Sequence, residues 1–168
     1  MLNNFMNNLI YEIAAEAVRL LRDKKLTVSA AESCTGGLLS AYLTAVPGVS
    51  SVYELGVTSY SCRIKNEMLG VKNSTLNSFG AVSENTAKEM AEGVRKKAGA
   101  DFGVSVTGVA GPDGSEGHNP GLVYIAAANK NGTAVKRLDI DAVSRDFVRS
   151  EAVKAALELL INTVKEVE

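Results

Sequence analysis

Apolar side chains recur every three or four residues in three long stretches of the chain, which predicts three amphipathic helices. They cover residues from about 8 to 25, 84 to 98 and 145 to 165. Ser83 is a suitable N-cap for the second helix, with the acidic Glu84 in its first turn. Residues 1–7, which include Asn3 and Asn4, are expected to form a loose lead-in.

Shorter stretches between these helices have the composition of strands. Residues 26–30 carry no charge, as expected of a strand covered on both faces. Further strands are predicted at 53–60, 103–107, 122–128 and 133–140, with a hairpin turn at Asn131 and Gly132, and short helices at 38–45, 64–69 and 74–79. This order predicts one three-layer α/β domain over residues 1–168, with a mixed, mostly parallel sheet.

Composition and charge narrow the function classes. The 168 residues are 46% apolar, and 18 basic against 19 acidic side chains give a net charge of −1, so we expect no partner held by bulk charge, neither nucleic acid nor membrane. The charge-free stretch 33–53 contains Gly36, Gly37, Pro47 and Gly48, which argue against a membrane span. The amino terminus lacks the basic start of an export signal, so a cytoplasmic location is expected.

Two loops at the expected carboxyl edge of the sheet are candidates for a site. The first, residues 32–37, leads from a strand into a helix, where backbone N–H groups and the helix dipole favour an oxyanion beside the Ser33 hydroxyl. Alternatively, Ser33 or Thr35 only caps the helix. Cys34 has no histidine near it in sequence and is expected to be a small buried apolar residue.

The second loop, residues 108–114, contains three glycines and a proline, which allow the backbone to approach a ligand closely; the alternative is a plain turn. His118, the only histidine, is expected to be solvated in a polar loop. A neutral lysine is another base for a serine, but its pKa must fall by roughly three units, which costs about 4 kcal/mol. Lys65 follows a predicted strand and is a candidate, unless it is an ordinary solvated lysine.

Five segments of the chain resemble the CinA carboxy-terminal family, whose characterised members are nicotinamide-nucleotide amidases. They keep the family's order and spacing, and the resemblance extends from about residue 8 to the end of the chain. The segments are residues 31–37, 56–61, Lys65 with 69–71, 80–84 and 107–114.

The resemblance implies hydrolysis of the carboxamide of nicotinamide mononucleotide to nicotinate mononucleotide and ammonia, with no metal and no cofactor. Ser33 resembles the nucleophile, Lys65 the base and Tyr60 the hydroxyl that assists proton transfer. The implied partner is a small pyridine nucleotide, and association into homo-oligomers is expected. The residues expected at the substrate are Glu32, Thr35, Gly36, Gly37, Thr107, Gly108, Ala110, Gly111 and Arg145.

The chain also departs from the family pattern. Cys62 stands where the family usually has asparagine, and Val143 and Ser144 precede Arg145 where glycine and aspartate are usual. The alternative function is therefore a weak or inactive nucleotide-binding or regulatory module. Arg145 and Arg149 are candidate contacts to a phosphate or a partner, or solvated arginines. The amino-terminal domain of longer relatives is absent, so a stand-alone protein is expected.

Overall fold

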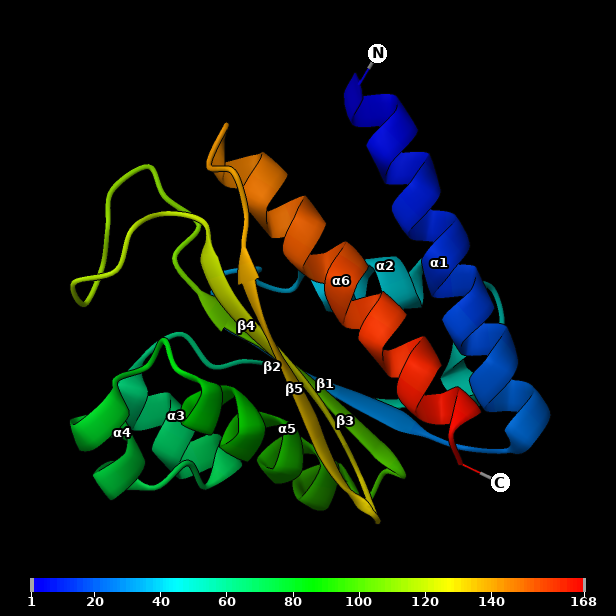
Figure 1. Cartoon of the computed structure of the whole chain (residues 1–168). Helices are drawn as coiled ribbons and strands as arrows, with labels where there is room; N and C mark the ends of the chain where they lie inside the picture. Colours follow the sequence, from blue (N-terminus) through cyan, green and yellow to red (C-terminus); the bar gives the residue numbers. More distant parts are fainter. Residues whose placement is uncertain (1, 168) are drawn as a thin grey trace.

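One five-stranded sheet forms the centre of the computed structural model, which describes residues 2–167 (Figure 1). The strand order is β2-β1-β3-β4-β5. β1 is parallel to β2 and β3, whereas β3–β4 and β4–β5 are antiparallel, so β4 alone is reversed. The bounds are β1 (Val28–Glu32), β2 (Tyr53–Thr58), β3 (Phe102–Gly108), β4 (Leu122–Asn129) and β5 (Gly132–Asp139).

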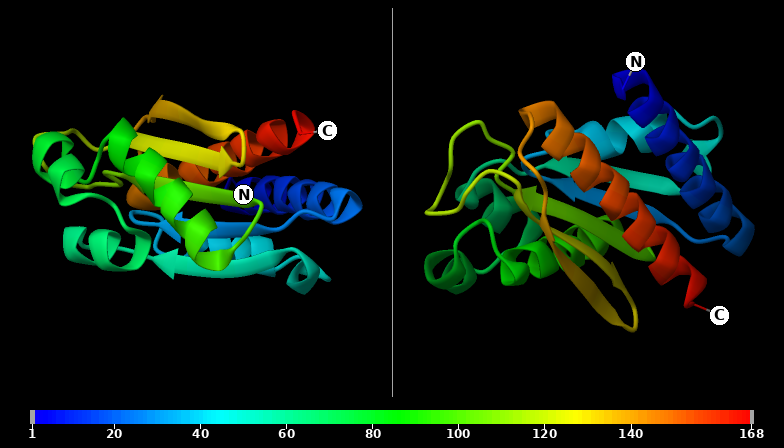
Figure 2. Two further views of the ribbon diagram at one scale, coloured as in Figure 1. Left: turned by 90° about the horizontal axis from the view of Figure 1, so that it is seen from below. Right: turned by 45° about the horizontal axis from the view of Figure 1, so that its top comes forward.

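Helices cover both faces of the sheet, which confirms the predicted three-layer α/β fold (Figure 2). One face carries α1 (Leu2–Lys24), α2 (Leu38–Thr44) and α6 (Arg145–Lys165), and α1 lies beside α6 (Figure 1). The other carries α3 (Cys62–Leu69), α4 (Asn73–Phe79) and α5 (Glu84–Ala98). A short 3₁₀ helix, Val49–Ser51, precedes β2. No helix within residues 2–167 is long and apolar enough to cross a membrane.

The central position of β1 explains its lack of exposed polar side chains. All five of its residues are buried. Val28 and Ala30 belong to the core beneath α1, α2 and α6, whereas Ala31 packs with Met90 and Val94 of α5 on the other face. A strand enclosed on both faces needs small or apolar side chains at every position, and this one ends at the acidic Glu32.

Most boundaries lie within two residues of the sequence prediction, and contacts account for two of the differences. Residues 2–7 are helical, so the predicted loose lead-in is wrong there, and the Tyr42 hydroxyl donates a 2.8 Å hydrogen bond to Asn7 Oδ1; Met1 lies outside the described residues. β1 begins at Val28 because the Thr27 N–H and hydroxyl bind the Asp101 carboxylate, at 2.9 and 3.0 Å, instead of joining the sheet.

α5 approaches α3 closely at Gly93. A Cβ atom at this position would lie only 1.9 Å from the Leu69 carbonyl oxygen, which is backbone and cannot swing aside. Leu69 is the last residue of α3, the helix that carries Lys65. The glycine therefore sets how deeply α3 lies against the molecule.

Candidate active site

The carboxyl ends of β1 and β2 bring Ser33 and Ser59 to one edge of the sheet. Ser33 follows the last residue of β1, and its N–H donates to the Val106 carbonyl of β3 at 2.9 Å. Ser59 follows β2, and its N–H donates to the Glu32 carbonyl at 2.8 Å. The parallel register of these strands thus continues one residue beyond the sheet and fixes the backbone of both serines.

Lys65 lies on α3 and is fully buried. Its Nζ is 3.0 Å from Ser33 Oγ, 2.6 Å from the Ser59 carbonyl oxygen and 3.5 Å from the Tyr60 carbonyl oxygen. Burial lowers the pKa of Lys65, and the charges of Cys62, Cys34 and Glu116, in this order, oppose part of this effect. Lys65 forms no ion pair with any described residue, and a buried lysine with a lowered pKa is a candidate base for Ser33.

Glu32, not Ser33 or Thr35, caps α2. Its carboxylate accepts the N–H groups of Gly37 and Leu39 at 3.0 Å and of Ser40 at 2.9 Å, and the Ser40 hydroxyl at 2.7 Å. Gly37 occupies the N-cap position and has no side chain that could cap the helix. The buried Thr35 Oγ1 has no hydrogen-bond partner among the described residues. The capping alternative for Ser33 is therefore wrong, and its hydroxyl is available to Lys65.

A cavity of about 190 Å³ opens above Ser33. Most of the residues predicted from the sequence line it, but Thr35, Gly36 and Gly37, which form the turn into α2, and Glu32, whose carboxylate caps α2 from the end of β1, do not. Lys65 lies behind Ser33 instead of in the lining. The lining consists of Ser33, Cys34, Tyr60, Ala81, Val82, Thr107, Gly108, Val109, Ala110, Gly111, Asp113, Ser115, Glu116 and Arg145.

Arg145, the first residue of α6, reaches the mouth of this cavity. Its Nη1 donates to the Gly111 carbonyl at 2.6 Å and its Nη2 to the Tyr60 hydroxyl at 3.4 Å. It has no carboxylate partner within residues 2–167. Tyr60 is 65% exposed, and its hydroxyl makes no hydrogen bond to Ser33 or Lys65 in the described part of the chain. The cavity is therefore lined by a guanidinium that forms no ion pair with a described residue.

The other nucleophile and base candidates are poorly placed. Burial raises the pKa of Cys34 to about 11, so its thiol is protonated at neutral pH, and its predicted buried position is confirmed. Cys62 is exposed and does not line the cavity. His118 is half-buried and exchanges backbone hydrogen bonds with Ser115, outside the cavity lining. Ser33 with Lys65 is thus the pair suited to nucleophilic chemistry.

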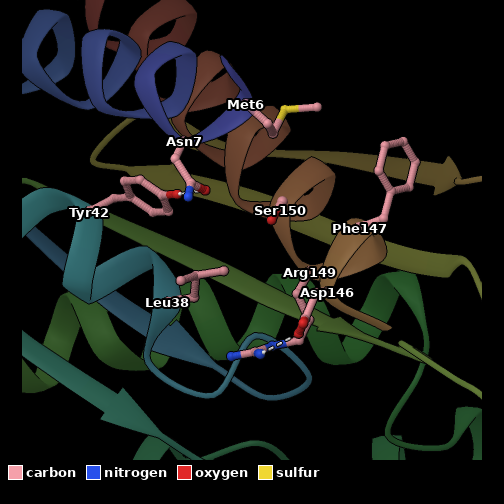
Figure 3. Close-up of a pocket in the computed structure, with 8 residues that line it drawn as sticks. All are labelled: Met6, Asn7, Leu38, Tyr42, Asp146, Phe147, Arg149 and Ser150. Atoms are coloured by element: carbon pink, nitrogen blue, oxygen red, sulfur yellow. Dashed lines mark hydrogen bonds and ion pairs between the residues drawn. The ribbon is translucent and has the colours of Figure 1, made fainter. Parts of the chain in front are cut away.

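Arg149 lies in a second hollow, of about 220 Å³, between α1, α2 and α6 (Figure 3). Its Nη2 donates to the Thr35 carbonyl at 2.8 Å, and its Nη1 lies 3.4 Å from the Asp146 carboxylate. Ser33 does not line this hollow. Arg149 therefore holds the turn after Ser33 from behind and does not face the cavity.

Sequence reasoning missed two parts of the site. The first is the Ser59 carbonyl, which accepts a hydrogen bond from Lys65 Nζ. The only signal for it in the sequence is that a predicted strand ends shortly before Lys65. Glu116 lines the cavity from the long loop between β3 and β4. The signal for that loop was its glycine content, which marks a close backbone approach but does not indicate which later side chain turns inward.

A serine that is hydrogen-bonded to a buried lysine at the carboxyl edge of a mixed sheet defines the class: an α/β protein with a serine–lysine site. Comparison with known proteins then gives the family. The CinA C-terminal domain matches residues 10–164, and the chain belongs to this family.

Individual relatives support this assignment to the CinA family. The structure resembles the crystal structure of a competence/damage inducible protein of Agrobacterium tumefaciens, with 39% identity, a TM-score of 0.89 and coverage of 94% of this chain and 96% of that one. The crystal structure of the competence damage-inducible protein A of Klebsiella pneumoniae is 35% identical in sequence, with a TM-score of 0.91 and coverage of 95% of this chain and 99% of that one. A CinA-like protein of Kosmotoga olearia is 46% identical over 90% of this chain and 38% of its own length. The chain spans little more than a third of such curated relatives.

Proposed function

We propose that the chain hydrolyses the carboxamide of nicotinamide mononucleotide to nicotinate mononucleotide and ammonia. The observation that carries this proposal is the 3.0 Å hydrogen bond between Ser33 Oγ and a fully buried Lys65 without a carboxylate partner in the described chain. Such a lysine is a base for a serine nucleophile at neutral pH. The family resemblance supports the choice of a pyridine nucleotide.

In the first half of the reaction, Ser33 Oγ attacks the carboxamide carbon while its proton passes to the Lys65 amine. The carbonyl oxygen becomes an oxyanion. Within the turn after β1, the N–H groups of Ser33 and Gly37 already donate to Val106 and Glu32, whereas those of Cys34 and Thr35 donate to no described acceptor. We assign the Cys34 N–H to the oxyanion, because Cys34 lines the cavity and Thr35 does not.

In the second half, Lys65 gives its proton to the amide nitrogen, the C–N bond breaks, and ammonia leaves an ester on Ser33. Water then attacks this ester while Lys65 takes a proton from it and returns one to Ser33 Oγ, releasing the carboxylic acid. Tyr60 is assigned to assist the proton transfer to the leaving nitrogen. The unpaired Arg145 suits the phosphate of the substrate, because a guanidinium binds phosphate oxygens in a fork.

The test is ammonia release from nicotinamide mononucleotide by the wild type and three variants. Ser33→Ala and Lys65→Met should each lower kcat at least roughly 1,000-fold, since nucleophile and base act as a unit. Ser115→Ala removes another hydroxyl that lines the same cavity and should change kcat less than about twofold. An equally fast Ser33→Ala would refute the nucleophile, and no ammonia from the wild type would refute the reaction.

The alternative of a binding or regulatory module rests on Cys62 in place of the usual asparagine. Cys62 is exposed, does not line the cavity and makes no side-chain hydrogen bond with a described residue. We therefore favour the active enzyme, and Cys62→Asn should leave turnover unchanged. Tight nucleotide binding without turnover, with activity appearing in Cys62→Asn, would support the module instead.

A further inference from the structure

The Glu116 carboxylate lines the cavity and is held there by two backbone N–H groups. Its Oε2 accepts the N–H groups of Ala81 at 2.8 Å and Val82 at 3.3 Å. These two donors are preorganised by the buried threonines behind them. Thr86 Oγ1 donates to the Gly80 carbonyl and Thr107 Oγ1 to the Ala81 carbonyl, both at 2.7 Å. Because the C=O and N–H of one peptide group point in opposite directions, these bonds orient the Ala81 and Val82 N–H groups toward Glu116 Oε2.

The backbone at Gly80 is shaped around this carboxylate. Gly80 has a φ of 78°, and a Cβ atom there would lie 2.6 Å from Glu116 Oε2. A side chain at position 80 would therefore be strained and would collide with the carboxylate. The second oxygen, Oε1, accepts no hydrogen bond from the described residues, which leaves one face of the carboxylate for a ligand.

The charged side chains that line the cavity are one cation, Arg145, and two carboxylates, Asp113 and Glu116, of which only Glu116 is held by backbone N–H groups. Arg145, at the start of α6, supplies a cation without an ion pair in the described chain, and Glu116, in the loop between β3 and β4, supplies a held anion. Glu116 also acts at the reacting end, although weakly: burial lowers the pKa of Lys65, and Cys62, Cys34 and, last, Glu116 oppose this shift in part. A ligand that carries both a positive and a negative charge matches this arrangement.

We propose that Glu116 is the counter-charge for the ring of an N-substituted pyridinium carboxamide, so that the site prefers a cationic ring over a neutral one. The inference rests on the proposed function and adds the substrate property that the site selects. A pyridinium carries its charge in the ring to which the carboxamide is attached, so a carboxylate in the cavity above Ser33 stabilises the bound substrate by direct Coulomb attraction. Neutral nicotinamide lacks both this charge and a phosphate for Arg145.

The experiment compares nicotinamide mononucleotide with its 1,4-dihydro form, in which hydride added at C4 makes the ring neutral while the carboxamide, ribose and phosphate are kept. Dissociation constants are measured by calorimetry in a Ser33→Ala background, so that no turnover intervenes. Adding Glu116→Gln should weaken the cationic ligand about fivefold, the size usual for a partly exposed charge pair, and the dihydro form less than twofold. The glutamine oxygen can still accept both N–H groups, so the loop is retained.

Glu158→Gln is the matched control, because Glu158 is an exposed glutamate of α6 that lies outside the cavity lining and forms no ion pair with a described residue. It should change both constants less than twofold. Equal weakening of both ligands by Glu116→Gln would assign Glu116 a purely structural role and overturn the inference. A charge-selective effect in a chain that releases no ammonia would uphold the inference and refute only the proposed reaction.

Discussion

Replacing the buried lysine by methionine should separate stability from activity in a way that depends on pH. Lys65→Met keeps an unbranched side chain of similar length and removes the amine. Folding of the wild type buries a group whose pKa is lowered, so the folded state binds fewer protons than the unfolded state between that lowered pKa and the ordinary value of about 10.4. The wild type is therefore penalised at low pH, and the methionine variant is not.

The size of the effect follows from proton linkage. One proton bound only by the unfolded chain changes the free energy of unfolding by about 1.4 kcal/mol per pH unit, and the sign makes the wild type more stable as pH rises. The advantage of Lys65→Met should thus be largest and constant below the lowered pKa of Lys65. It should then shrink with that slope and level off near pH 10.4. Lost hydrogen bonds to Ser33 and Ser59 shift the whole curve but not its slope.

The measurement is urea unfolding of both proteins at intervals between about pH 6 and pH 10, with Lys88→Met as the control. Lys88 is an exposed lysine of α5, so its replacement should give a difference that does not vary with pH. Other groups titrate in all three proteins and largely cancel in the differences. A Lys65→Met difference that is as flat as the control would mean that Lys65 is protonated throughout, and the general-base role would be refuted.

Three further predictions follow from single contacts. Glu32→Gln should lower the free energy of unfolding by about 2 kcal/mol in urea melts, because an amide replaces the carboxylate that caps α2; an unchanged midpoint would contradict this. Gly93→Ala should cost about 3 kcal/mol or more by the same assay, since its Cβ would meet a carbonyl oxygen at 1.9 Å. In native protein at pH 8, iodoacetamide should label Cys62 but not Cys34, whose pKa is about 11; two labels per chain would refute this.

Much of the fold could be predicted because each signal is local. The helical period marked α1, α5 and α6, and Gly70 and Gly99 end α3 and α5 at positive φ as glycines at these positions predict. The boundaries of β1 were less accessible. Leu26 and Thr27 have strand composition, but Thr27 binds Asp101, a residue far along the chain, and such a tertiary contact leaves no mark in the periodicity.

The candidate site was predictable in its members but not in their contacts. Ser33 and Lys65 are 32 positions apart, and the parallel pairing of β1 with β2 is what brings their segments to one edge. Glu32 was expected at the substrate, yet its carboxylate turns toward α2. Backbone N–H groups and a ligand both attract a carboxylate, so the sequence alone leaves both positions open.

The orientation of Glu32 bears directly on the state of Lys65. Glu32 adjoins Ser33 in sequence, and a free carboxylate beside the Lys65 amine would stabilise the ammonium and raise its pKa. Instead, both oxygens of Glu32 accept hydrogen bonds from the start of α2, while Lys65 Nζ meets only a hydroxyl and two carbonyl oxygens. A carbonyl accepts a hydrogen bond from a neutral amine without supplying a full negative charge. The arrangement that caps α2 thus also leaves Lys65 without a carboxylate partner among the described residues, which the proposed base role requires.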